Sequence, residues 1–318
     1  MTRRKSNIIG FVLFVTMVSF ALYAQTQEKP QDNKVPSLKV DVDLVTIPAT
    51  VTDAHNRVIT GLDKENFVLW EDKLEQKISY FSADDVPISI GLIFDVSGSM
   101  KDKFSTAKDA AVTFLNTGNP QDEYFLVTFS NRPEMSEDFT TDIAKLRNRL
   151  VFESTKGMTS MYDAVYLGLE KLKDGTQPKK ALLLITDGED NRSRYTFANV
   201  REFVKEQDVQ IYAIGITGDW NSQLGAGRTG RSLIEELSDL TGGHAFFPDS
   251  VYDLEDICTK IAVELKNQYV LGYKSTNEAK DGKWRKIKVD VKPPKGVGRL
   301  NVRWKTGYYA GVGERPGN

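Results

Sequence analysis

Cysteine and histidine are scarce in this sequence, with one cysteine and two histidines among 318 residues. A single cysteine, Cys258, cannot form a disulfide within the chain, and Cys-rich zinc patterns are excluded. Neither His55 nor His244 belongs to a His-Glu-x-x-His motif, and the sequence has no Gly-x-Ser-x-Gly element and no phosphate-binding glycine loop. The sequence therefore lacks the common signatures of metalloproteases, serine hydrolases and nucleotide-binding enzymes.

The sequence also lacks a large excess of charge of either sign, because it contains 42 Lys and Arg and 44 Asp and Glu. Without a basic field, a nucleic-acid partner is excluded from our expectations. The apolar run Ile8–Phe20 is shorter than the about 20 residues that span a bilayer, and three basic residues precede it. We therefore expect residues 1–24 to be an export signal cleaved before Gln25. The alternative is an uncleaved anchor, and only then would the protein contact a membrane.

Hydropathy patterning divides the rest of the chain into four segments. Residues 25–37 are polar with two prolines and predict a flexible linker. Residues 38–83 and 267–310 show the alternation of apolar and polar residues that is typical of strands, whereas residues 87–266 alternate short apolar runs with helical patterns. A length of 318 residues also predicts about two domains.

The two alternating segments have too few strands to bury a core separately. In the first segment, the apolar phase slips near Leu44–Val45, and two further strands are expected at Phe67–Trp70 and Lys77–Phe81. We expect both segments to form one β-sandwich into which residues 87–266 are inserted. The inserted part predicts an α/β fold with a doubly wound, mostly parallel sheet.

Polar side chains follow the buried strand Ile88–Phe94 directly. Asp95, Ser97 and Ser99 form an Asp-x-Ser-x-Ser pattern at the carboxyl end of that strand, the edge where open α/β sheets bind ligands. A carboxylate and two hydroxyls at this spacing can turn their oxygens to one point, and oxygen ligands suit Mg²⁺. Because Asp, Ser and Gly also gather in ordinary turns, this pattern alone leaves a plain loop as the alternative.

Two later stretches add oxygen ligands of the same kind. Thr159 lies in the loop before a helical pattern, and Asp187 follows the buried strand Ala181–Ile185. Glu189 and Asp190 come next and are candidates either to orient water on a metal or to act as a general base.

With these residues the sequence resembles the von Willebrand factor A domain family. The metal-ion-dependent adhesion site of that family consists of Asp-x-Ser-x-Ser, a Thr from a later loop and an Asp that ends a later strand. The resemblance implies that the metal ligands here are Asp95, Ser97, Ser99, Thr159 and Asp187. It also implies a bound Mg²⁺ or Mn²⁺, with Ca²⁺ less favoured by the small hydroxyl-rich set, and a protein partner that offers an Asp or Glu carboxylate.

The resemblance extends to the flanks and to a neighbouring position. The stretches GLDKENFVLWED, QKISYFS and NQYVLGYKS are similar to those of von Willebrand factor A-related proteins found in acidobacteria. The segment Asp95–Asp102 resembles the inserted domains of integrin β-subunits, in which further acids hold an adjacent metal. Asp102 matches that pattern, but Lys103 stands where the next acid would be. The alternative role for Asp102 is to begin the first helix, where negative charge is favourable.

We therefore expect an exported protein, periplasmic, at the cell surface or secreted from a bacterium, that binds a protein partner through a divalent cation and has no enzymatic activity. A structural or assembly scaffold of the cell envelope with a stabilising metal is the first alternative. A metal-dependent hydrolase that uses Glu189 or Asp190 as its base is the second.

Overall fold

The computed structural model describes residues 44–188, 190–216 and 226–311. The predicted export signal, the predicted linker, residues 38–43 of the first expected strand, and Glu189 lie outside the described residues. In the part that is described, no helix combines the length and the apolar character that crossing a membrane requires.

A central six-stranded sheet organises residues 88–266. Its strand order is β10-β9-β8-β5-β6-β7, and all neighbours are parallel except β6 and β7. The strands are β5 (Ile88–Asp95), β6 (Glu123–Phe129), β7 (Pro133–Thr140), β8 (Lys179–Thr186), β9 (Gln210–Gly215) and β10 (Ala245–Phe246). Every residue of β5 is buried, which is why its sequence is a continuous apolar run rather than an alternation.

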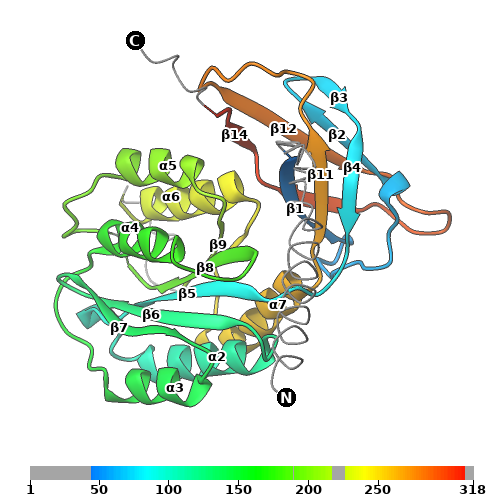
Figure 1. The fold of residues 1–318 in the computed structure, drawn as a ribbon. Coiled ribbons are helices and arrows are strands. Elements are labelled where there is room, and N and C mark those ends of the chain that lie inside the picture. Colours follow the sequence, from blue (N-terminus) through cyan, green and yellow to red (C-terminus); the bar gives the residue numbers. More distant parts are fainter. Residues whose placement is uncertain (1–43, 189, 217–225, 312–318) are drawn as a thin grey trace, which may run out of the picture. The chain divides into compact units, whose positions relative to one another are not determined.

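Helices cover both faces of this sheet (Figure 1). They are α2 (Phe104–Thr117), α3 (Ile143–Phe152), α4 (Met161–Leu172), α5 (Phe197–Glu206), α6 (Ala226–Thr241) and α7 (Leu254–Lys266). One apolar core joins α2, α3 and α7 to one face, and a second core joins α4, α5 and α6 to the other. Short 3₁₀ helices lie at Lys64–Asn66, Gly98–Met100 and Val251–Asp253. The predicted doubly wound, mostly parallel sheet is confirmed.

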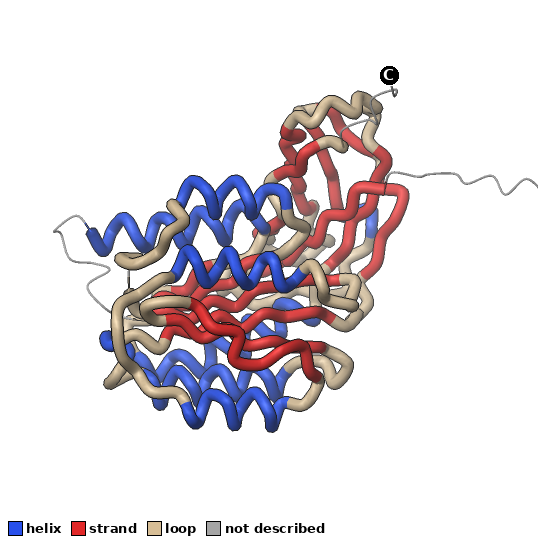
Figure 2. Tube along the Cα trace, turned by 60° about the vertical axis from the view of Figure 1, so that its left-hand side comes forward, coloured by secondary structure: helices blue, strands red, loops and turns tan. Residues whose placement is uncertain are grey.

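Two antiparallel sheets are built from the flanking segments (Figure 2). Their strands are β1 (Leu44–Thr52), β2 (Phe67–Glu71), β3 (Leu74–Gln76), β4 (Ile78–Ser82), β11 (Tyr269–Lys274), β12 (Trp284–Val291), β13 (Asn301–Trp304) and β14 (Gly307–Tyr309). The orders are β13-β1-β11-β4 and β14-β12-β2-β3, so each sheet takes strands from both sides of the α/β segment. This is the predicted arrangement, in which the α/β segment is inserted between two halves of a sandwich.

The two flanking sheets share one apolar core. Ile47, Ala49 and Val51 of β1 are buried in the same cluster as Leu69 of β2 and Ile287 of β12. These three residues point to the core as the expected alternation after the phase slip requires, and Thr50 and Thr52 on the other face of β1 are buried as well.

Glu71 also lies inside this sandwich, where its carboxylate accepts hydrogen bonds from the hydroxyls of Tyr273, Ser275 and Tyr308. These bonds tie β2 to strands of the other flank and satisfy a carboxylate that is 2% exposed.

Three edge strands with few apolar residues, β3, β7 and β14, were missing from our sequence expectations. β7 begins at Pro133 and carries several charged residues at the edge of the central sheet, as edge strands often do. The turn at Asp72–Lys73 joins β2 to β3, while β4 leaves for the other sheet and pairs with β11. β14 pairs with β12. These strands have too few apolar residues to stand out in the pattern, and their pairing partners are distant in sequence.

Candidate functional site

The carboxyl ends of β5 and β8 lie side by side at the centre of the sheet. Their register aligns Phe94 with Ile185, so Asp95 comes level with Thr186 and Asp187 follows directly. From β5 the chain continues to β6 on one side, and it later returns to β8 on the other. This reversal of strand order is the position at which open α/β sheets form ligand crevices.

Asp95 is held by two fixed donors. The backbone N–H of Ser97 donates to its Oδ1 at 2.8 Å, and the Thr186 hydroxyl donates to its Oδ2 at 2.6 Å. Sequence reasoning missed Thr186, whose side chain is buried and whose role depends on the register of β5 against β8.

Hydroxyl and carboxylate oxygens converge above these strand ends. The Oγ atoms of Ser97 and Ser99 lie 3.1 Å apart, and the Ser99 hydroxyl donates to Asp187 Oδ1 at 2.7 Å. A Cβ placed on Gly188 would lie 3.6 Å from Thr159 Oγ1 and 3.8 Å from Ser99 Oγ, so Thr159 reaches the same place. The structure thus brings together all five residues that the sequence proposed as ligands.

Burial sets the electrostatics of this cluster. Asp95 is fully buried and Asp187 is 6% exposed, whereas Ser99 is open to solvent. Burial raises the pKa of Asp95 to about 6; hydrogen bonds from Thr186 and Ser97 oppose this rise, and the negative charge of Asp187 adds to it. A positive ion that reached the cluster through its open side would relieve this cost.

The loop that carries Thr159 is shaped by glycine and asparagine. Gly157 has a φ of +84°, a conformation that L side chains rarely adopt, and its carbonyl accepts the Gly98 N–H at 3.0 Å. Thr159 exchanges two hydrogen bonds with Asn191: its N–H donates to Asn191 Oδ1 at 2.9 Å, and its carbonyl accepts the Asn191 N–H at 3.0 Å. The glycine contact fixes this loop against the Ser97–Ser99 loop, and Asn191 fixes it against the loop after Asp187.

Asp190 is engaged away from the five oxygens. Its carboxylate accepts the Tyr162 N–H at 2.9 Å and both the N–H and the hydroxyl of Ser193. In return, Asp163 accepts the N–H groups of Arg194 and Tyr195. The two acids clamp the loop after β8 onto the first turn of α4, a role that sequence reasoning did not foresee. Asp102 is exposed.

Lys103 enters the site from the start of α2. Its Nζ lies 2.7 Å from Asp187 Oδ2, and the Asp187 side chain is fully shielded from solvent in this pair. The two oxygens of Asp187 are therefore bonded to Ser99 and to Lys103.

Neither histidine joins the cluster. His55 lies in an exposed turn, and His244 packs edge-on against the ring of Phe246. Burial lowers the pKa of His244 to about 4, with the positive charges of Arg303 and Lys260 acting in the same direction. No group of three or more His, Cys, Asp or Glu suited to a metal occurs in the described part of the chain. The cluster at Asp95 differs from such groups because most of its oxygens are hydroxyls.

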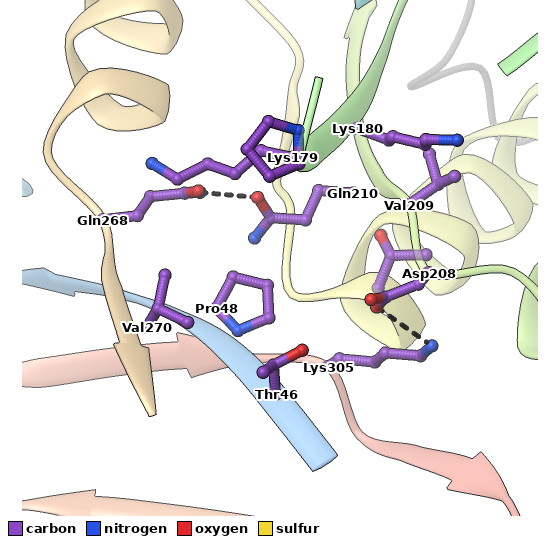
Figure 3. Close-up of a pocket in the computed structure, with 12 residues that line it drawn as sticks. Thr46, Pro48, Lys179, Lys180, Asp208, Val209, Gln210, Gln268, Val270 and Lys305 are labelled. Carbon is purple, nitrogen blue, oxygen red and sulfur yellow. Dashed lines mark hydrogen bonds and ion pairs between the residues drawn. The ribbon is translucent and has the colours of Figure 1, made fainter. Parts of the chain in front are cut away.

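A small cavity of about 60 Å³ lies at the opposite edge of the sheet (Figure 3). It is bordered by Lys179 and Gln210, the first residues of β8 and β9, and by residues of the flanking sheets. Gln268 donates to Gln210 Oε1 at 2.6 Å, and Lys305 donates to the Gln207 carbonyl at 2.7 Å. These polar groups join the α/β segment to the sandwich, and they lie at the other ends of the strands from Asp95.

The fold and its polar strand ends define an α/β domain with a ligand site at the switch point. Residues 90–189 match the von Willebrand factor type A domain family, so this segment is a von Willebrand factor type A domain. The matched stretch includes all five proposed ligands. The closer resemblance to acidobacterial proteins stays a prediction.

One solved structure shares the fold at low sequence identity, and two others are similar to part of this chain. A von Willebrand factor type A protein from Catenulispora acidiphila is 11% identical, with a TM-score of 0.50, and the match covers 85% of this chain and 73% of that one. BatB from Bacteroides thetaiotaomicron is 16% identical (TM-score 0.46; 56% of this chain, 99% of that one). The von Willebrand factor domain of the pilus tip protein Mfa5 from Porphyromonas gingivalis is 13% identical (TM-score 0.45; 57% and 97%).

Proposed function

We propose that this chain is an exported, divalent-cation-dependent protein-binding module. Asp95, Ser97, Ser99, Thr159 and Asp187 would hold a Mg²⁺ or Mn²⁺ ion, and this ion would offer a coordination position to an Asp or Glu carboxylate of a partner protein. The observation that carries the proposal is the convergence of these oxygens at the switch point, with buried carboxylates below and exposed Ser99 above.

The donor set fits a hard, small cation. All five side chains offer oxygen, and three of the five are neutral hydroxyls, so an ion bound there would keep part of its positive charge. The raised pKa of Asp95 supports the same conclusion, because the hydrogen bonds from Thr186 and Ser97 do not offset the cost of burying its charge. When bound, the ion supplies Lewis acidity and an exchangeable coordination position; the chain's residues hold it and leave its outer side to a partner.

Binding rather than catalysis is favoured by the surroundings of the cluster. Metal-assisted hydrolysis needs a general base near the metal. Among the described residues nearby, Asp190 is committed to the clamp on α4 and Asp102 is exposed without a hydrogen bond to the cluster. We therefore propose a module without enzymatic activity of its own.

Calorimetric titration of Mg²⁺ and Mn²⁺ tests the metal site. We expect one site in the wild-type protein and none in Asp95→Ala, while Asp102→Ala, a matched acid outside the cluster, binds as the wild type does. Circular dichroism confirms that both variants are folded. Unchanged metal binding in Asp95→Ala would refute the site assignment.

A second experiment addresses the partner. An acidic peptide should bind the Mg²⁺-loaded protein and dissociate in EDTA, and a peptide with Asn and Gln in place of its acids should not bind. If Mg²⁺ raised the melting temperature but neither peptide nor envelope proteins bound in a cation-dependent way, the scaffold alternative would be favoured.

Export is proposed from residues 1–24 alone. Expression in a bacterial host with N-terminal sequencing of the product tests it: we expect a mature protein that begins at Gln25 outside the cytoplasm. An intact N-terminus in the membrane fraction would favour the anchor.

A further inference from the structure

We propose that Lys103 is a tethered cation that competes with the divalent metal ion for Asp187, an inference that rests on the proposed metal site. The Lys103 ammonium donates a hydrogen bond to Asp187 Oδ2 at 2.7 Å, so it holds an oxygen that the ion would use. Lys103 would thus oppose an ion at Asp187 and set the affinity of the site below what its five oxygens alone would give.

The two partners of Asp187 differ in their compatibility with a metal ion. A hydroxyl has lone pairs as well as a proton, so Ser99 can coordinate a cation through its oxygen and still donate to Asp187 Oδ1. A protonated lysine has three donors and no lone pair. Lys103 can therefore only repel an incoming ion, and it is the partner of Asp187 that must yield.

The position of Lys103 in its helix gives a second, independent argument. Lys103 is the N-cap residue of α2, and its side chain makes no capping bond to the helix. A positive charge at a helix N-terminus is unfavourable because the exposed N–H groups there are already partly positive. Lysine at this place therefore does not serve the helix, and its ion pair with Asp187 accounts for it.

The ion pair between Lys103 and Asp187 contributes to stability because it is largely buried. The side chain of Asp187 is fully shielded and that of Lys103 is 22% exposed, so each charge is partly removed from water. Removing the partner of a buried charge is strongly destabilising. Lys103 thus stabilises the metal-free protein, and a metal ion replaces this contribution when it binds.

The test is calorimetric titration of Mg²⁺ and Mn²⁺ into the full chain and into Lys103→Met, with Lys103→Gln as a second neutral variant. Because a unit charge at ion-pair distance from a ligand opposes a divalent ion, we expect about 10-fold or more tighter binding in both variants. Lys103→Arg, which keeps the charge, should stay within about threefold of the wild type. Lys101→Met removes an exposed charge two residues away and serves as the matched control, because solvent and salt screen that charge.

Melting temperatures give a readout that a merely structural lysine would not produce. In EDTA we expect Lys103→Met to melt below the wild type, and in saturating Mg²⁺ we expect this difference to close or reverse. Equal or weaker metal binding in Lys103→Met and Lys103→Gln than in the wild type would overturn the competition and make Lys103 a positioning residue for Asp187. Absence of metal binding in the wild type and in both variants would overturn the metal site itself, and this inference with it.

Discussion

Buried aspartates lie at both ends of the central sheet, but the two ends differ. The carboxyl ends of the strands carry the features of a ligand site, and the amino ends carry those of a structural contact. Asp122, at the amino end before β6, is 2% exposed and accepts hydrogen bonds from Ile88 N–H, Asn119 N–H and the Tyr124 hydroxyl. Asp95, at the carboxyl end of β5, accepts hydrogen bonds from Ser97 and Thr186 and lies near the charge of Asp187. Burial raises the pKa of both carboxyls.

The comparison shows that a buried acid with a raised pKa does not by itself mark a functional site. Asp122 is surrounded by donors from three chain segments that it holds together. At the other end, a second carboxylate and three hydroxyls share the space, and one of them, Ser99, faces solvent. Two features therefore distinguish the candidate site from the structural contact at Asp122. One side of the cluster is open to solvent, and its oxygen atoms outnumber the hydrogen-bond donors that face them.

Asp122→Ala, at the amino end of the sheet, should have the largest effect on the stability of the protein. The substitution leaves three donors without their acceptor, and each unsatisfied buried group costs about 1 to 3 kcal/mol, so we expect a loss of roughly 3 to 5 kcal/mol in the free energy of unfolding. Urea denaturation in EDTA measures it. Mg²⁺ affinity should be unchanged. A loss under about 1 kcal/mol would contradict the structural role of Asp122, and an altered affinity would mean that the two ends are not independent.

Mg²⁺ should stabilise the folded protein through the cluster at Asp95, at the carboxyl end of the sheet, and not through Asp122. A ligand that binds the folded state alone adds about 2.7 kcal/mol to the free energy of unfolding at 100 times its Kd. We expect this gain in urea denaturation of the wild type and its absence in Asp95→Asn, which keeps the shape of the side chain but not its charge. A full gain in Asp95→Asn would place the stabilising ion elsewhere.

The pH dependence of stability should show the smallest of the three effects. The pKa of Asp95 rises from 3.8 to about 6 on folding, so between these values the folded state holds the proton more firmly than the unfolded state. The metal-free protein should therefore lose stability as pH rises from about 4 to about 6, by roughly 2 kcal/mol at 1.36 kcal/mol per pKa unit. Urea midpoints at pH 4.5 and 7 in EDTA measure this loss.

Asp95→Asn is the control for the pH experiment, because it lacks the titrating group but keeps the other ionisable residues. The difference between wild type and variant isolates the contribution of Asp95. If stability fell equally with pH in the wild type and in Asp95→Asn, ionisation of Asp95 would not be the cause of the loss.

The parts of the fold that were predictable have strong local patterns. β5 and β8 are apolar runs, and the helices carry clear apolar faces, so the sequence alone places Asp95 and Asp187 at the carboxyl ends of two strands. β3, β7 and β14 could not be found, because edge strands with few apolar residues are defined by their pairing partners rather than by their own residues.

The candidate site, like the fold, could be predicted only where the sequence carries a local pattern. Its five oxygens follow a sequence spacing, whereas the roles of Thr186, Asp190 and Lys103 follow from geometry. Thr186 depends on the strand register, Asp190 on the contact between two loops, and Lys103 on the direction in which α2 begins. None of these leaves a periodic trace in the chain, which explains why Asp190 was expected at the metal and is bonded to the start of α4.

The interleaving of the two flanking sheets has a consequence for how the protein is made. The Leu62 N–H donates to the hydroxyl of Tyr269 across 207 residues of sequence, and β1 and β4 have β11 between them. On a ribosome, the N-terminal half of the sandwich emerges long before β11 exists to pair with it. Contacts of such separation fold slowly and leave strand edges open meanwhile. The strands of the α/β segment pair over shorter separations in the chain than the strands that join the two flanks. The α/β segment can therefore fold first and bring its two ends together, so that the sandwich can close.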